Sequence, residues 1–393
     1  MKEYSKKLSA LPPYLFVKIN SLKKDAYAKK NDVIDLAMGN PDLPTPEGIV
    51  NCLVDTVKNH PGTHRYPQAK GMPKLRKAIC DWYKKRFDVD LNPENEALVL
   101  IGSKEGIAHM CMAWLDPGET VLVANPAYPV HFNGVILAGG TIYDMPLLPE
   151  NGWLPDLTKI PEKVARKAKL MFLNYPNNPT TAVIEDDNFF KEVVRFAKKY
   201  DIIVCHDNAY SEVVFGDYEV PSFLQTPGAK DVGVEFYSLS KTYNMAGWRI
   251  GFCVGNPSVV APLEKFKSFI DYGVPTFLQL AAVHALNSDE KINKDTMEEY
   301  KKRRDKFCDG LNKLGFVVEK PKSTMYLWAK IPEKFKSMGS LAFSEELLKE
   351  TGIAASPGVG FGSFGEGYLR FALVTHFNRF HDALIRLKKF VSK

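Results

Sequence analysis

The sequence predicts an α/β fold: a large, doubly wound domain with a mostly parallel sheet, followed by a smaller α+β domain at the C-terminal end. The first observation is a series of short, almost wholly apolar segments that predict buried strands: 97–101, 120–124, 169–174 and 202–206. The second is an amphipathic helical repeat between the last two of them, formed by Phe189, Val193, Phe196 and Tyr200. Apolar strands that alternate with such helices indicate βαβ units in a sheet covered on both faces.

The chain divides into three predicted parts. Its 393 residues, 45% of them hydrophobic, are too many for one simple domain. Beyond residue 285 long charged helices replace the strand–helix alternation, and the strand-like segments 325–328 and 368–373 follow. Proline and glycine clusters at 11–13 and 39–44 set the first residues apart as an arm. We therefore predict an N-terminal arm (1–45) that joins the small domain, a large domain (46–285) and a small C-terminal domain (286–393).

Composition excludes several classes of protein. The 52 basic and 46 acidic residues leave a formal net charge of +6, scattered in short runs, which is not typical of a nucleic-acid-binding protein. The six cysteines lie far apart without metal-ligand spacing, as in a reduced cytoplasmic protein without a metal. The start of the chain does not resemble a signal peptide, and no apolar stretch approaches the roughly 18 residues of a membrane span. We expect a cytoplasmic protein that binds small molecules.

Polar residues follow three predicted strands, at the edge where an open α/β sheet binds its ligands. The turn 102–106 opens a helix, and free backbone N–H groups there suit a phosphate, although an ordinary βα turn is an equal alternative. The segment 177–180 (Asn-Asn-Pro-Thr) is either a polar turn or part of a site. Asp207, with Tyr210 nearby, closes an apolar strand, and a buried carboxylate needs a cation or several donors. A structural salt bridge is the alternative explanation for Asp207.

The segment 238–251 (Ser-Leu-Ser-Lys-Thr-Tyr-Asn-Met-Ala-Gly-Trp-Arg-Ile-Gly) is more specific. Small hydroxyl residues, a lysine, a Gly-Trp-Arg triplet and a second glycine follow a strand-like segment at fixed offsets. This stretch resembles the lysine motif of the pyridoxal 5′-phosphate (PLP) enzymes of fold type I, in the class I/II aminotransferase branch. The resemblance covers nearly the whole chain, in the order Gly39-Asn40-Pro41-Asp42, Tyr66-Pro67, Tyr128, Asn178-Pro179-Thr180, Asp207, Tyr210 and Arg370.

Within this family the chain most resembles the bacterial glutamate–pyruvate (alanine) aminotransferases and the related LL-diaminopimelate aminotransferases. The segments that carry this finer resemblance are 11–16 (Leu-Pro-Pro-Tyr-Leu-Phe), 102–106, 244–249 and 338–340. It implies PLP fold type I, a homodimer with a shared active site, and amino acids and 2-oxo acids as substrates.

The resemblance implies a role for each matching residue around the cofactor ring. Lys241 binds PLP covalently and then moves a proton between the substrate Cα and the cofactor. Asp207 pairs with the pyridinium nitrogen and keeps it protonated. Tyr210 and Asn178 hydrogen-bond the 3′ oxygen, and Tyr128 stacks on the ring.

Further roles concern the phosphate and the substrate. The resemblance places five residues near the phosphate: Ser103, Lys104, Ser238, Ser240 and Arg249. Of these, Arg249 and the helix N-terminus supply most of the countercharge. Tyr66 reaches the phosphate of the neighbouring subunit. Asn178, Arg370 and Gly39 bind substrate: Arg370 clamps the α-carboxylate through a bidentate bond that lysine cannot reproduce, and Gly39 lets the backbone approach it.

Two departures from the family pattern bear on function. The family commonly has glycine after Asn-Pro-Thr, whereas this chain has Thr181, so we expect a turn that avoids positive φ and keeps Asn178 in place. No second arginine can be assigned to a distal substrate carboxylate. Lys104 is a candidate for that contact, and support of the phosphate is its alternative role.

The sequence therefore predicts a homodimeric PLP aminotransferase with a ping-pong mechanism, acting on alanine and 2-oxoglutarate. LL-Diaminopimelate and aspartate are the alternative substrates. A PLP-dependent lyase or decarboxylase on the same scaffold is the alternative enzyme class. A regulator built on an aminotransferase-like domain needs a helix-turn-helix segment, for which the 45-residue arm has no room.

Overall fold

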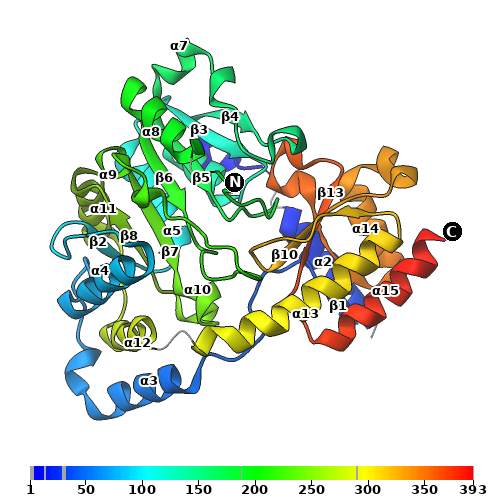
Figure 1. Cartoon of the computed structure of the whole chain (residues 1–393), viewed down its shortest axis with the longest axis horizontal. Helices are drawn as coiled ribbons and strands as arrows, with labels where there is room; N and C mark the ends of the chain where they lie inside the picture. The colour runs from blue at the N-terminus through cyan, green and yellow to red at the C-terminus, as the bar shows by residue number, and fades with distance from the viewer. Residues whose placement is uncertain (1–3, 13–14, 29–31, 187, 289–290, 393) are drawn as a thin grey trace.

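The computed structural model describes residues 4–12, 15–28, 32–186, 188–288 and 291–392. A larger part, built around one sheet, lies beside a smaller part that contains the C-terminal helices (Figure 1). In the described chain the larger part holds a seven-stranded sheet in the order β2-β8-β7-β6-β5-β3-β4. Its strands are β2 (Ala97–Leu100), β3 (Thr120–Asn125), β4 (Thr141–Pro146), β5 (Ala168–Asn174), β6 (Ile203–Asp207), β7 (Gly233–Ser238) and β8 (Gly251–Gly255).

The sheet is mostly parallel, as predicted. β3, β4, β5, β6 and β7 pair in parallel, whereas β8 is antiparallel to both of its neighbours, β7 and β2. The predicted strand segments 97–101, 120–124, 169–174 and 202–206 coincide with β2, β3, β5 and β6 to within one residue at each end.

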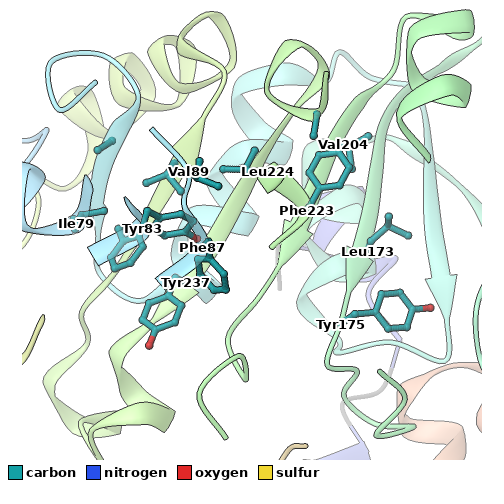
Figure 2. Close-up of a cluster of buried hydrophobic side chains, with 14 of the residues drawn as sticks. Ile79, Tyr83, Phe87, Val89, Leu173, Tyr175, Val204, Phe223, Leu224 and Tyr237 are labelled. Atoms are coloured by element: carbon teal, nitrogen blue, oxygen red, sulfur yellow. The ribbon is translucent and has the colours of Figure 1, made fainter. Parts of the chain in front are cut away.

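Both faces of this sheet are covered by helices. Alternate strand residues point to opposite sides of the sheet and pack against different helices. Val99, Leu122 and Met171 belong to one hydrophobic cluster, and Leu98, Val121 and Leu170 belong to another. The first cluster includes residues of α4 (Pro73–Phe87), α8 (Asn188–Tyr200) and α12 (Thr276–Asn287). The second includes residues of α5 (Ser103–Trp114), α6 (Val130–Ala138) and α11 (Pro257–Ile270). Figure 2 shows part of the first cluster, with Tyr83 and Phe87 of α4 close to Tyr237 of β7. The doubly wound architecture is confirmed.

The smaller part is α+β. Its described strands form a four-stranded sheet in the order β12-β13-β10-β9, with antiparallel neighbours. The strands are β9 (Val317–Val318), β10 (Tyr326–Lys330), β12 (Ser356–Pro357) and β13 (Tyr368–Ala372). Its long helices are α13 (Lys291–Lys313), α14 (Gly339–Thr351) and α15 (Phe377–Val391). In Figure 1, α13 extends from below the larger part along the smaller one.

The N-terminal segment contacts the smaller part. It contains α1 (Lys6–Ser9), α2 (Leu15–Ala28) and β1 (Ile34–Asp35), and β1 pairs in parallel with β11 (Ile353–Ala354). Ile19 and Ala37 pack with Leu348 and Ala354. Pro13 and Tyr14 of the family-like segment 11–16 lie outside the described residues. The limits of the three domains remain a prediction, and residue 285 falls within the last turn of α12.

Shorter elements connect these layers. The remaining described helices are α3 (Glu47–Asn59), α7 (Glu162–Ala165), α9 (Ala229–Val232), α10 (Leu239–Thr242), η1 (Pro61–His64), η2 (Pro149–Asn151), η3 (Leu157–Lys159), η4 (Phe223–Gln225), η5 (Ala246–Trp248), η6 (Glu333–Met338), η7 (Gly358–Phe361) and η8 (Ser363–Gly365). None of the helices in the described ranges combines the length and apolarity needed to cross a bilayer.

Candidate active site

A cavity of about 260 Å³ lies where the parallel strands end and the smaller sheet begins. Asn174, Asp207 and Ser238 end β5, β6 and β7 and line this cavity, as expected for ligands of an open α/β sheet. Twelve of the thirteen predicted site residues line it: Gly39, Ser103, Lys104, Tyr128, Asn178, Asp207, Tyr210, Ser238, Ser240, Lys241, Arg249 and Arg370. Residues far apart in the sequence are therefore brought to one place, and Tyr66 is the exception.

Lys241 lies in the short helix α10, directly after β7. The side chain of Ser238 caps this helix by accepting a hydrogen bond from the Ser240 N–H at 3.2 Å. Lys241 Nζ donates to the carbonyl of Gly39 at 2.8 Å. Burial lowers the pKa of the Lys241 amine, the charge of Arg370 lowers it further, and Tyr326 opposes the shift. A lowered pKa raises the fraction of neutral amine, which is the nucleophilic form.

Asp207 is buried at the end of β6, and one of its two carboxylate oxygens has no hydrogen-bond partner among the described residues. Its Oδ2 lies 3.2 Å from His131 Nε2, and the ring of His131 stacks on Phe172. Its Oδ1 is buried without a hydrogen-bond partner among the described residues. A buried carboxylate with an unpaired oxygen is costly unless a donor is added. The protonated ring nitrogen of PLP is a donor of the required charge.

Tyr210 and Asn178 lie in contact, as the predicted shared role requires. Asn178 Nδ2 donates to the Tyr210 hydroxyl at 3.4 Å, and this hydroxyl lies 3.1 Å from that of Tyr326. Burial raises the pKa of Tyr210 well above its ordinary value. Tyr210 therefore keeps its proton and can donate a hydrogen bond.

The turn after Asn178 differs from the prediction. Thr181 has a φ of 66°, so the expectation that this turn avoids positive φ is wrong. The Thr181 N–H donates to the Asn177 carbonyl at 3.0 Å, and the Asn177 N–H donates to the Ala182 carbonyl at 2.8 Å. These two bonds close the turn around Thr181, which adopts the left-handed conformation at a cost of about 1–2 kcal/mol. The predicted consequence for the site is retained, because Asn178 lines the cavity.

Two cationic side chains of the cavity wall, Lys104 and Arg249, lie near the start of α5, and we call this part the cationic end of the cavity. Ser103 is the first residue of α5, and Gly102 before it has a φ of 78°. A Cβ atom on Gly102 would overlap the guanidinium of Arg249, so this guanidinium lies directly against the start of α5. Burial lowers the pKa of Lys104, and the nearby charge of Arg249 lowers it further. Helix N–H groups and two cations fit a phosphate dianion.

Arg370, in β13 of the smaller sheet, lines the same cavity. It donates to Asn178 Oδ1 at 2.7 Å and to the Ala37 carbonyl at 2.9 Å. Its guanidinium carbon lies 4.2 Å from the ring centroid of Tyr326 and 4.6 Å from that of Phe361. Its Nε is buried without a hydrogen-bond partner among the described residues. A carboxylate could be added there, which fits the predicted clamp.

Tyr66 lies away from the cavity of its own chain. Its side chain is 89% exposed, and its ring contacts that of Tyr272 with a centroid distance of 5.5 Å. The structure is that of one chain, so the reach of Tyr66 into a neighbouring subunit stays a prediction.

Several lining residues were not predicted from the sequence: Met38, Asn174, Ala209, Ala246 and Tyr326. His131, the partner of Asp207, was also missed. Tyr326 begins β10, and an aromatic residue at the start of an apolar strand is typical of core packing. His131 follows Tyr128 closely at the start of α6, and that proximity was the available signal.

The fold and the site together define a PLP-dependent aminotransferase. The chain belongs to the family described as "Aminotransferase class I and II", whose profile matches residues 31–379. The enzymes of this family use PLP, and the open oxygen of Asp207, the cationic end and the buried Lys241 fit that cofactor.

Proteins similar to this chain include aminotransferases that are named for different substrates. The chain is 47% identical over 382 residues to the glutamate–pyruvate aminotransferase AlaC of Escherichia coli, covering 97% of this chain and 92% of AlaC. It is also 47% identical over 389 residues to the LL-diaminopimelate aminotransferase of Moorella thermoacetica, covering 99% of this chain and 98% of that enzyme. Among solved structures, substrate-bound BacF of Bacillus subtilis superposes with a TM-score of 0.94 at 40% identity, covering 99% and 98% of the two chains. Aspartate aminotransferase of Thermus thermophilus gives 0.91 at 26% identity, covering 99% and 100%.

Proposed function

We propose that this aminotransferase transfers the amino group of alanine to 2-oxoglutarate, giving pyruvate and glutamate. The observation that carries the proposal is the distribution of arginines around the cavity. Among the described lining residues the arginines are Arg249, beside the start of α5, and Arg370, in β13 of the smaller sheet. Arg370 suits the α-carboxylate that all amino acids share. The small side chain of alanine needs no further cation, and Lys104 is available for the distal carboxylate of glutamate.

LL-Diaminopimelate is the second candidate substrate. Relatives named LL-diaminopimelate aminotransferases are 46–49% identical to this chain over nearly its whole length, as similar as AlaC. Aspartate is a weaker candidate, because its distal carboxylate also depends on Lys104. A lyase or decarboxylase on the same scaffold would release ammonia or CO₂ without a 2-oxo acid acceptor.

The residues around the ring have the following proposed roles. Bound PLP supplies the electron sink and carries the amino group between the two substrates. Lys241 Nζ would hold the cofactor, would be freed when the substrate amine binds, and would then take up and return the proton of the substrate Cα. Asp207 Oδ1 holds the proton on the ring nitrogen. Tyr210 and Asn178 donate hydrogen bonds to the 3′ oxygen, and Tyr128 packs on the ring.

The remaining roles belong to the phosphate and the carboxylate. We assign Ser103, Ser238, Ser240, Arg249 and Lys104 to the phosphate end, with Lys104 shared between phosphate and distal carboxylate. Arg370, Asn178 and Gly39 bind the α-carboxylate side. Gly39 is needed for space, because a Cβ atom there would overlap the Tyr326 hydroxyl.

We further propose that the enzyme is a homodimer. Tyr272, whose ring contacts that of Tyr66, is 60% exposed, and two large apolar side chains close to it in the chain, Phe269 and Ile270, are 81% and 61% exposed. Burial of such a group of side chains between two copies is favourable, and it would bring Tyr66 to the neighbouring chain.

We propose a cytoplasmic location because the six cysteines are free thiols, most of them buried.

The experiment that tests the proposed function is a set of half-reactions. Purified enzyme loaded with PLP is mixed with single amino acids, and conversion to the aminated cofactor is followed by absorption. Alanine and glutamate should both convert it, and pyruvate and 2-oxoglutarate should restore the starting spectrum. Conversion by LL-diaminopimelate with no response to alanine would replace the first candidate by the second.

A further inference from the structure

Tyr326 is a buried tyrosine in the cavity wall that contacts both sides of the proposed site. Its hydroxyl lies 3.1 Å from the hydroxyl of Tyr210. The guanidinium carbon of Arg370 lies 4.2 Å from the centroid of its ring. The same guanidinium carbon lies 4.6 Å from the ring centroid of Phe361. One side chain therefore contacts the group proposed to bind the cofactor oxygen and the group proposed to bind the substrate carboxylate.

The backbone holds Tyr326 firmly against the segment that carries Tyr210. Ser323 Oγ donates to the carbonyls of Tyr210 at 3.3 Å and Val213 at 2.7 Å. The Thr324 N–H donates to the same Val213 carbonyl at 2.9 Å. Tyr326 thus enters the cavity from β10 while the residues just before it are hydrogen-bonded to the loop after β6. A substitution of the hydroxyl alone should leave this backbone arrangement in place.

The single proton of the Tyr210 hydroxyl decides which of the two hydroxyls donates. Burial raises the pKa of Tyr210 well above its ordinary value. Tyr210 therefore keeps its one proton. Because the proposed function assigns that proton to the 3′ oxygen, the 3.1 Å contact between the hydroxyls needs Tyr326 as the donor and Tyr210 as the acceptor. A hydroxyl that accepts one hydrogen bond becomes a stronger donor of its own proton.

We propose that Tyr326 is a positioning residue with two separable functions: its hydroxyl directs the proton of Tyr210 toward the 3′ oxygen of PLP, and its ring holds the Arg370 guanidinium flat for the substrate carboxylate. The inference rests on the proposed function, because it uses the roles assigned there to Tyr210 and Arg370. It adds that both roles depend on the same side chain.

The hydroxyl is tested in the PLP-loaded enzyme by titrating the absorption band of the bound cofactor against pH. A hydrogen bond to the 3′ oxygen stabilises its anionic form, so loss of donor strength raises the pH midpoint. Tyr326→Phe should raise the midpoint by about 0.5–1 pH unit, and Tyr210→Phe should raise it further. The double variant should match Tyr210→Phe, because Tyr326 acts through Tyr210. A midpoint unchanged in Tyr326→Phe, or additive shifts in the double variant, would overturn the proposal for the hydroxyl.

The ring is tested by steady-state kinetics. Tyr326→Phe keeps the ring and should leave KM for alanine and glutamate unchanged while kcat falls. Tyr326→Leu removes the ring and should raise both KM values roughly 2- to 30-fold, because the cation–π contact with Arg370 is lost. A rise in KM that is equal in the two variants would overturn the proposal for the ring. Even if Tyr326→Leu does not fold, a rise in KM in Tyr326→Phe, which keeps the ring, would overturn the proposal for the ring.

The matched control is Tyr300→Phe. Tyr300 is a fully buried tyrosine of the same hydrophobic cluster, but it does not line the cavity. Its substitution should change neither the pH midpoint nor KM, and a shift as large as that of Tyr326→Phe would overturn the assignment. Failure of the proposed function is distinguishable, because it would be visible in the unsubstituted enzyme as a lack of PLP on Lys241 or of transamination.

Discussion

The guanidinium of Arg370 and the side-chain amide of Asn178 are joined by a 2.7 Å hydrogen bond across 192 residues of sequence. Asn178 accepts from Arg370 through its oxygen and donates to Tyr210 through its nitrogen. The amide therefore links the substrate side of the cavity to the cofactor side, and it joins the loop after β5 to β13 of the smaller sheet. A change at Asn178 should affect both sides at once.

Asn178→Ala removes an acceptor from the buried Arg370 and a donor from Tyr210. We expect kcat/KM for alanine and glutamate to fall by similar factors, roughly 10- to 100-fold, as for the loss of a hydrogen bond to a charged group. The pH midpoint of the cofactor band should rise in the same variant. Steady-state kinetics and the spectral titration measure the two effects. A fall in kcat/KM without any shift of the midpoint would contradict the proposed link.

Lys241 provides a test that relates stability to pH. Because burial lowers its pKa in the folded, PLP-free protein, the unfolded chain binds the proton more tightly. The resulting destabilisation is fully present below the folded pKa and disappears as the pH rises to the ordinary value of 10.5. Lys241→Met should therefore be more stable than the unsubstituted PLP-free protein at neutral pH, and the difference should shrink as the pH is raised. Urea unfolding of both proteins between neutral pH and pH 10 measures it.

Lys241→Met should also remove the absorption band of bound PLP. Borohydride reduction of the unsubstituted enzyme, followed by peptide mass spectrometry, should place the pyridoxyl group on Lys241. A pyridoxyl group on another lysine would refute the assignment.

Gly102 and Gly118 form a matched pair for testing the cationic end. Both have positive φ, 78° and 90°, so alanine at either position is strained by about 1–2 kcal/mol. A Cβ atom on Gly102 would overlap Arg249, whereas the space around Gly118 is open. We expect both substitutions to lower the free energy of unfolding, but only Gly102→Ala to weaken PLP binding, by about tenfold or more. Equal PLP affinities in the two variants would place the phosphate elsewhere.

Subunit mixing tests whether the active site is shared. Tyr66→Ala and Lys241→Ala subunits should each be inactive or nearly so as homodimers. In a mixed dimer one site contains Lys241 from one chain and Tyr66 from the other, so part of the activity should return. Mass spectrometry of the mixture confirms that subunits exchange. No recovery in a mixture that does exchange would refute the shared site.

Strands and helices whose sequence pattern comes from neighbouring residues were predicted well. The apolar strands and the helical repeat of Phe189, Val193, Phe196 and Tyr200 each depend on residues close in the chain, and the structure has β2, β3, β5, β6 and α8 there. The direction of β8 could not be predicted, because an apolar strand has the same pattern whether it runs parallel or antiparallel. The left-handed Thr181 was missed for a related reason, since the turn is closed by backbone hydrogen bonds of Asn177 rather than by the preference of threonine.

Tyr326 shows the limit of sequence reasoning within the site. Its ring lies under Arg370 and its hydroxyl meets Tyr210, but both contacts depend on the smaller sheet lying against the loop after β6. Nothing in the residues beside it distinguishes a tyrosine that faces a cavity from one that fills a core. The residues recovered from the sequence were those with a family motif around them, and His131 and Tyr326, which lack one, required the structure.

Substrate preference is tested by comparing Arg370 with Lys104. Arg370→Lys keeps the charge but loses the bidentate geometry, so kcat/KM should fall by a similar factor for every amino acid, roughly 10- to 100-fold. Lys104→Ala should weaken glutamate and leave alanine nearly unchanged if Lys104 Nζ contacts the distal carboxylate. The Lys104 amine lies 5.9 Å from the ring centroid of Tyr128, and both residues line the cavity.

The ratio of kcat/KM for glutamate to that for alanine is the measurement that separates the two roles of Lys104. An unchanged ratio in Lys104→Ala, together with weaker PLP binding, would assign the lysine to the phosphate alone. Glutamate would then be held by Arg370 and by the shape of the cavity, without a distal contact from Lys104. A ratio that falls while PLP affinity is retained would assign the lysine to the substrate, because a point charge on a flexible stem can hold a distal carboxylate without excluding alanine.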